Sequence, residues 1–193
     1  MTGPDPLAHG WWLASRASGL VALGLLTIAV LTGLVLGGRL TRRPGAARAI
    51  RSLHEHAAVA GLLAVGVHGA TLLGDAWLRP GVAGVLVPGA IGYRPLPVAT
   101  GIAAAYVAAT LGLSYPLRRR VGVTRWRTAH RLTVVAYALA VVHTMTAGTD
   151  AALAWVFWPT LGSAAVAALL LARRMAGARG ARVPRPSAVP AER

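Results

Sequence analysis

Five long apolar segments fill most of this chain and restrict it to one class of fold. Each is close to the roughly 20 residues that an α-helix needs to cross a bilayer. Because helices satisfy their own backbone hydrogen bonds in lipid, the segments predict an all-α membrane protein, a bundle of about five transmembrane helices. They run approximately over residues 11–38, 53–78, 98–116, 125–147 and 151–171.

The composition agrees with a membrane protein. Hydrophobic residues make up 55% of the 193 residues and the mean hydropathy is +0.58, whereas a soluble domain of this length normally carries more charge. The net charge is +15, and every basic residue apart from histidine is arginine. Because the arginines cluster at the ends of apolar segments, we attribute them to topology and membrane lipids, and expect no nucleic-acid partner.

The arginine clusters alternate along the chain and therefore predict an orientation. They lie in the first and third connections and after the fifth segment: Arg39, Arg42, Arg43, Arg48 and Arg51; Arg118, Arg119, Arg120, Arg125 and Arg127; Arg173, Arg174, Arg179, Arg182 and Arg185. The positive-inside rule places the N-terminus outside and the C-terminus in the cytoplasm. We expect a multi-pass protein of a bacterial cytoplasmic membrane.

The chain divides into three parts on this basis. Residues 1–10 form an outer tail, residues 11–173 the transmembrane domain, and residues 174–193 a basic, Pro-rich cytoplasmic tail that we expect to be disordered. The connection over 79–97 is rich in Gly and Pro and is expected to form a lid or re-entrant piece at the outer face.

Cysteine is absent from the sequence. This excludes disulfides, thiolate metal sites, iron–sulfur clusters and covalently attached c-type haem. A redox cofactor in this chain must therefore be held by histidine, methionine or the backbone.

Four histidines form two pairs in the apolar segments. His54 and His68 are 14 residues apart in the second segment, and His130 and His143 are 13 apart in the fourth. Each spacing spans about 20 Å of a hydrocarbon core of roughly 30 Å. The two segments run parallel, so His54 and His130 share the cytoplasmic side, and His68 and His143 the outer side. Paired imidazoles suit six-coordinate haem iron, and we expect two stacked haems.

The rotation around the helix axis is less regular. At about 100° per residue, His68 returns to within about 40° of His54, whereas His143 lies about 140° from His130. The fourth helix would need a π-bulge, a kink or a rotation to present both ligands. Two alternatives are that His130 is an interfacial residue, and that all four histidines are polar packing between helices.

Two further histidines are weaker candidates. His56 competes with His54, but it lies about 120° from His68, so His54 is the better partner. His9 belongs to the N-terminal tail and is interpreted as a surface residue.

Three other polar residues have alternative interpretations. Asp75 and Asp150 fall at outer helix ends, where they are interfacial caps or groups that gather Fe(III) or accept protons. Tyr137 lies midway between the ligands of the fourth segment, where it either bridges the haems or packs within the bundle. The tryptophans near helix ends match an aromatic belt.

Residues 15–147 resemble the ferric reductase-like transmembrane domain that is shared by ferric reductases, NADPH oxidases and the haem subunit of methionine-sulfoxide reductase systems. The resemblance rests on SRASGLVAL, LHEHAAVAGLLAVGVH, PVATGIAAAYVA and WRTAHR, followed by a histidine 13 residues after the first. The family shows the same unequal spacings of 14 and 13. It implies two haems of b type, with His54 and His130 holding the inner one and His68 and His143 the outer one.

The resemblance also has implications beyond the haem ligands. Arg16 matches an arginine beside the outer haem, where it would compensate a propionate or bind an anionic acceptor; the alternative is that it snorkels to the interface. NADPH oxidases carry a histidine where this chain has Leu72, which disfavours superoxide production.

The flavin and nicotinamide domains of ferric reductases have no counterpart in this sequence. The resemblance therefore implies the electron-transfer component of an oxidoreductase. A separate cytoplasmic flavoprotein or a quinone would donate electrons, and Fe(III), oxygen or a partner reductase at the outer face would accept them. Two alternative functions remain open, a haem-free membrane scaffold and a transporter that uses the histidines as a proton or ion relay.

Overall fold

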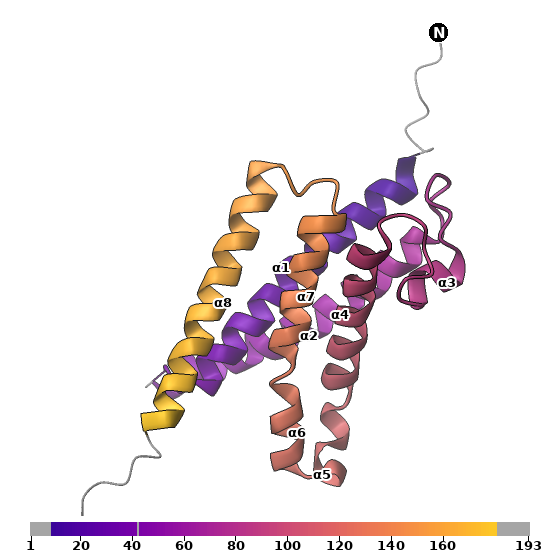
Figure 1. Ribbon diagram of the computed structural model, residues 1–193. Helices are drawn as coiled ribbons and strands as arrows, with labels where there is room; N and C mark the ends of the chain where they lie inside the picture. Colours follow the sequence, from indigo (N-terminus) through magenta and orange to yellow (C-terminus); the bar gives the residue numbers. More distant parts are fainter. Residues whose placement is uncertain (1–8, 42, 181–193) are drawn as a thin grey trace, which may run out of the picture.

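The computed structural model describes residues 9–41 and 43–180, and these residues contain helices and connections but no strand (Figure 1). The helices are α1 (Gly10–Gly37), α2 (Pro44–Leu72), α3 (Gly81–Leu86), α4 (Pro95–Leu113), η2 (Tyr115–Leu117), α5 (Arg118–Val121), α6 (Val123–His130), α7 (Thr133–Ala147) and α8 (Ala154–Gly180). The all-α fold class is therefore confirmed. The predicted tails fall mainly on residues 1–8 and 181–193, which lie outside the described residues.

Two helical units make up the bundle. In the first, α1 and α2 pack antiparallel along most of their length; in the second, α4 packs against α7, while α8 leans on α1 (Figure 1). Small residues allow the close approach of α1 and α2, since a Cβ added to Gly61 would lie only 3.0 Å from the side chain of Leu26. We call the first of these two units, α1 with α2, the α1–α2 unit. We call the second, α4 with α7 and the short helices that connect them, the α4–α7 unit.

Three helices are long and apolar enough to cross a membrane, namely α1, α4 and residues 154–177 of α8. The two other predicted spans are less clear by length and composition. Helix α2 has 29 residues, but its histidines and Glu55 make it more polar, and α7 has only 15 residues, short of the roughly 20 that a span needs. Large apolar side chains such as Leu63 and Leu113 are exposed, as a lipid-facing surface requires.

The predicted fourth segment is two helices rather than one. The chain turns at Arg131 and Leu132, whose N–H groups donate to the carbonyls three residues earlier, and the Thr133 hydroxyl donates to the His130 carbonyl at 2.8 Å. These contacts replace regular α-helical hydrogen bonds. His130 therefore ends α6 while His143 belongs to α7, so a break separates the two histidines whose spacing did not fit one straight helix.

Arginine-rich segments gather at one end of the bundle. The α1–α2 connection, α5 and the last turns of α8 all lie toward this end, and the start of α1, α3 and the α7–α8 connection lie toward the other (Figure 1). We call the first of these the arginine-rich end. The predicted 79–97 connection lies at the opposite end and includes the short helix α3, whose Leu86 carbonyl accepts a hydrogen bond from Tyr106 of α4.

The small buried core joins α1, α7 and α8. It is centred on Leu34, Tyr137 and Ala167, each no more than 4% exposed. The Tyr137 hydroxyl accepts a hydrogen bond from Thr27 of α1 and lies 2.8 Å from the hydroxyl of Ser163 in α8. Tyr137 is thus a packed tyrosine within the bundle, with its hydroxyl directed toward α1 and α8.

Candidate functional site

The structure brings the four histidines together in two pairs. The ring centroids of His54 in α2 and His130 in α6 are 6.2 Å apart with their planes at 85°, and those of His68 in α2 and His143 in α7 are 6.4 Å apart at 71°. A metal–imidazole bond is about 2.0 Å long, so two rings on opposite sides of one ion have centroids roughly 6 Å apart. We call His54 and His130 the first pair, and His68 and His143 the second pair. Each pair has the separation at which two rings can share one metal ion.

Three of the four rings are held by backbone carbonyls of a neighbouring helix. Their Nδ1 atoms donate to these oxygens, His54 to Ala29 at 2.7 Å, His68 to Ser15 at 2.8 Å and His143 to Pro97 at 2.9 Å. A carbonyl oxygen only accepts, so these contacts place the proton on Nδ1 and leave the Nε2 lone pair free. In this tautomer Nε2 is able to bind a metal ion.

Each of these carbonyls is followed, four residues later on the same helix, by a glycine that contacts the same ring. A Cβ added to Gly19 would lie 3.0 Å from His68, one added to Gly33 would lie 3.1 Å from His54, and one added to Gly101 would lie 2.5 Å from Nδ1 of His143. Real Cβ atoms rarely approach this closely. The rings therefore lie in places that only glycine leaves open, and we call each carbonyl with its glycine a carbonyl–glycine seat.

Gly19, Gly33 and Gly101 were not predicted as site residues from the sequence. A signal was present, because Gly19 and Gly33 are 14 residues apart, the same spacing that separates His54 and His68. In an antiparallel pair of helices, equal spacings bring both glycines opposite both histidines. The carbonyls themselves have no side-chain signature and could not have been found.

His130 is held differently. Its Nδ1 is buried and has no hydrogen-bond partner in the described part of the chain; the Leu111 carbonyl lies close, but not in the geometry of a hydrogen bond. The ring instead stacks on Trp126, with centroids 4.6 Å apart and planes at 20°, and Trp126 Nε1 donates to the Ser114 hydroxyl at 3.0 Å. Trp126, predicted only as part of an aromatic belt, is thus the support of His130.

The paired rings bridge the two helical units. Helix α2 packs along α1 but makes few or no close backbone approaches to α6 and α7. His54 and His68 reach the α4–α7 unit through their side chains, while α1 holds them from behind. The rings on α2 therefore meet those on α6 and α7, although the backbones of these helices make few close approaches.

The other two histidines lie apart from these pairs. His56 is exposed, and its Nδ1 donates to the Ser52 carbonyl of its own helix at 2.7 Å. His9 is exposed and lines a pocket of about 300 Å³ with three tryptophans, Asp75 and Ala76. His54, and not His56, thus lies beside His130, and its role as a ligand stays a prediction.

Arg16 forms an ion pair that was not predicted from the sequence. Its Nε donates to Oδ2 of Asp150 at 2.7 Å, Nη2 contacts Oδ1, and the guanidinium lies 3.9 Å from the centre of the Trp12 ring. Arg16 directly follows Ser15, whose carbonyl holds His68. The pair therefore links the start of α1 to the α7–α8 connection beside the second pair of histidines.

Asp75 has a purely local role in the structure. Its Oδ1 accepts hydrogen bonds from the backbone N–H groups of Trp77 and Leu78, both at 2.9 Å. These contacts form an Asx turn after the end of α2 and cap no helix, and the two predicted roles of Asp75 stay predictions. Asp150, in contrast, is bound to Arg16 from another helix.

Comparison of the chain with protein-family models, with curated proteins and with solved structures found no match. The resemblance to ferric reductase-like domains therefore rests on the sequence motifs alone and stays a prediction.

Proposed function

We propose that this protein is a membrane cytochrome of b type that carries electrons across the bacterial cytoplasmic membrane. His54 and His130 would hold an inner haem, and His68 and His143 an outer haem. The observation that carries the proposal is the pairing of the four rings at 6.2 Å and 6.4 Å, close to the spacing expected across one metal ion.

The number of ligands favours haem over a bare metal ion. Among the described residues, no group of three or more His, Asp or Glu side chains converges, so each site offers only two protein ligands. A protein zinc site uses three or four ligands, whereas a haem would supply four porphyrin nitrogens itself and would need only the two histidines of each pair. A haem with two histidine ligands, when bound, supplies reversible one-electron transfer.

The residues around each site have two roles in this proposal. The carbonyls of Ser15, Ala29 and Pro97 fix the tautomer and orientation of three rings and increase their basicity as ligands. The surrounding apolar helices keep water out, which controls how readily the site accepts charge.

The direction of transfer follows from charge. We propose five spans, in which α2 and the α6–α7 segment cross the membrane beside α1, α4 and α8, with the arginine-rich end in the cytoplasm. A separate flavoprotein or quinol would donate electrons at or near this end. Fe(III), oxygen or a partner reductase would accept them at the outer face, so the chain would be the electron-transfer component of a ferric reductase-like system.

Proteoliposomes provide a direct test. Purified protein is inserted into vesicles loaded with ferricyanide, dithionite is added outside, and the loss of ferricyanide absorbance is followed. We expect fast loss with the wild-type protein and with His56→Ala, and slow, protein-independent loss with His68→Ala. Equal rates with wild-type protein and with empty vesicles would overturn the proposal and favour the haem-free scaffold or the transporter.

A further inference from the structure

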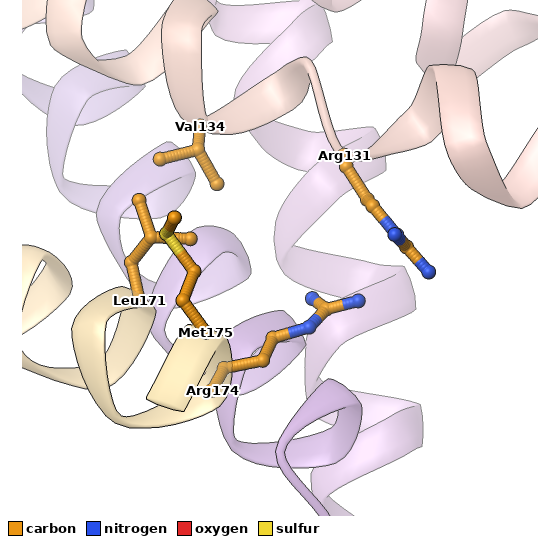
Figure 2. Close-up of a pocket in the computed structure, with 5 residues that line it drawn as sticks. All are labelled: Arg131, Val134, Leu171, Arg174 and Met175. Atoms are coloured by element: carbon orange, nitrogen blue, oxygen red, sulfur yellow. The ribbon is translucent and has the colours of Figure 1, made fainter. Parts of the chain in front are cut away.

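Two arginines, one in the α6–α7 break and one in α8, line one pocket at the arginine-rich end. The pocket has a volume of about 270 Å³ and is lined by Arg131, Val134, Leu171, Arg174 and Met175. Figure 2 shows the Arg131 side chain reaching down from the α6–α7 break while that of Arg174 rises from α8, with the three apolar side chains beside them. One side of the pocket is therefore cationic and the other is apolar.

Neither guanidinium forms an ion pair within the described residues. The ion pair found there joins Arg16 and Asp150. Both side chains line the same pocket, so their like charges share one small space. Two like charges that converge without a carboxylate form a site whose free energy an anion would lower. The planar guanidinium groups match phosphate oxygens in geometry.

Arg174 is held in place by a glycine. A Cβ added to Gly37, in the last turn of α1, would lie 2.6 Å from Nη1 of Arg174. The guanidinium thus lies against the C-terminal end of α1, where the helix dipole favours a cation. Its position is fixed by packing, in contrast to that of the neighbouring Arg173, which is exposed.

We propose that this pocket binds the phosphate of an anionic phospholipid, with an acyl chain lying over Val134, Leu171 and Met175. Two features select a lipid over a free anion. The apolar side of the pocket would give a free phosphate no contact, and the site lies at the end of the bundle where lipid headgroups meet arginine. The proposal uses none of the haem ligands and holds whether or not haem is bound.

Native mass spectrometry of the detergent-solubilised protein tests the site. Phosphatidylglycerol and phosphatidylcholine are added in turn and the bound fraction is measured. We expect a preference for phosphatidylglycerol that falls at least about fivefold for each arginine removed in Arg131→Gln and Arg174→Gln. Arg173→Gln is the matched control and should retain the preference. No preference in the wild-type protein, or an equal loss in Arg173→Gln, would overturn the proposal.

Two further measurements separate the lipid from other anions. Inorganic phosphate at millimolar concentration should not displace phosphatidylglycerol, because it lacks the acyl chain; full displacement would indicate a simple anion site and overturn the proposal. A Gly37→Leu substitution should weaken lipid binding by displacing Arg174. If the arginine variants lose cofactor absorbance but keep the lipid preference, the arginines serve the first histidine pair and the lipid proposal is wrong.

Discussion

The two histidine pairs have nearly the same ring separation but are supported in different ways. In the second pair, both His68 and His143 donate to a backbone carbonyl and lie against a glycine. In the first pair, only His54 has a carbonyl–glycine seat, while His130 relies on stacking with Trp126 beside a break in the helix. Similar ligand geometry is thus reached by main-chain support in one site and partly by a side chain in the other.

This difference determines which substitutions should disturb the rings of each pair. A backbone carbonyl cannot be removed by substitution, so the second pair is most sensitive at the glycines that admit its rings. The first pair is also sensitive to substitution of Trp126. This side chain supports His130, whose buried Nδ1 has no hydrogen-bond partner among the described residues.

Removal of a ligand should have the largest effect. We expect His54→Ala, His68→Ala, His130→Ala and His143→Ala each to lower the content from two haems to one per chain, because one axial bond cannot hold the haem as two do. The measurement is the haem-to-protein ratio of each purified variant. His56→Ala is the control and should retain two haems. Retention of both haems in His68→Ala would contradict the assignment of the second pair.

Alanine at the carbonyl–glycine seats should have the next largest effect. Gly101→Ala introduces a Cβ 2.5 Å from His143, and such overpacking costs about 1–3 kcal/mol. We expect a lower haem content and a lower Tm, with smaller effects for Gly19→Ala and Gly33→Ala because their contacts are longer. Gly24→Ala and Gly66→Ala are matched controls on α1 and α2, since a Cβ there would meet nothing within 4 Å. Equal effects at the seats and the controls would mean that the glycines serve helix packing in general.

Loss of Trp126 should distinguish the two pairs. Stacked aromatic pairs contribute about 0.5–1.5 kcal/mol beyond their burial, so Trp126→Ala should weaken haem binding about two- to tenfold at the first pair alone. The measurement is haem titration of the apoprotein, performed in the His68→Ala background to isolate the first pair. Trp126→Phe should restore most of the affinity. Trp158→Ala, which removes a side chain that is 68% exposed, should have no effect.

The smallest effect is expected at Ser15. Its hydroxyl lies 3.3 Å from Nδ1 of His68, but its carbonyl is the closer acceptor at 2.8 Å and is kept in Ser15→Ala. We expect a change in affinity at the second pair of less than about 1 kcal/mol. Ser18→Ala is the control, because that hydroxyl donates only to carbonyls of its own helix. A loss of the haem in Ser15→Ala would show that the hydroxyl, and not the carbonyl, holds His68.

The fold class and the pairing of the histidines could be predicted from the sequence, because long apolar segments and the depth of a residue along a helix follow directly from spacing. The break at Arg131 could not be predicted, because it contains no Pro or Gly and involves a hydrogen bond from the Thr133 hydroxyl to the His130 carbonyl. The mismatch in rotation between His130 and His143 indicated only that the helix would need a π-bulge, a kink or a rotation to present both rings.

The supports of the rings were harder to predict than the rings themselves. Backbone carbonyls are identical at every residue, so only the equal spacing of Gly19 and Gly33 with the histidines pointed to the seats. Trp126 lies near the end of an apolar segment, as residues of an aromatic belt do. Its stacking on His130 depends on how α6 turns toward α2. The ion pair of Arg16 with Asp150 joins residues 134 positions apart, a contact that only the folded bundle creates.

Haem binding at the two histidine pairs is tested most directly by a dithionite-reduced minus oxidised absorption spectrum of the purified protein, combined with its haem-to-protein ratio. If the two histidine pairs are haem sites, the spectrum will show a sharp α-band of b type, at two haems per chain. A single haem would contradict one of the two sites, with the first pair the one to examine. A colourless protein from a haem-replete host would contradict the account as a whole.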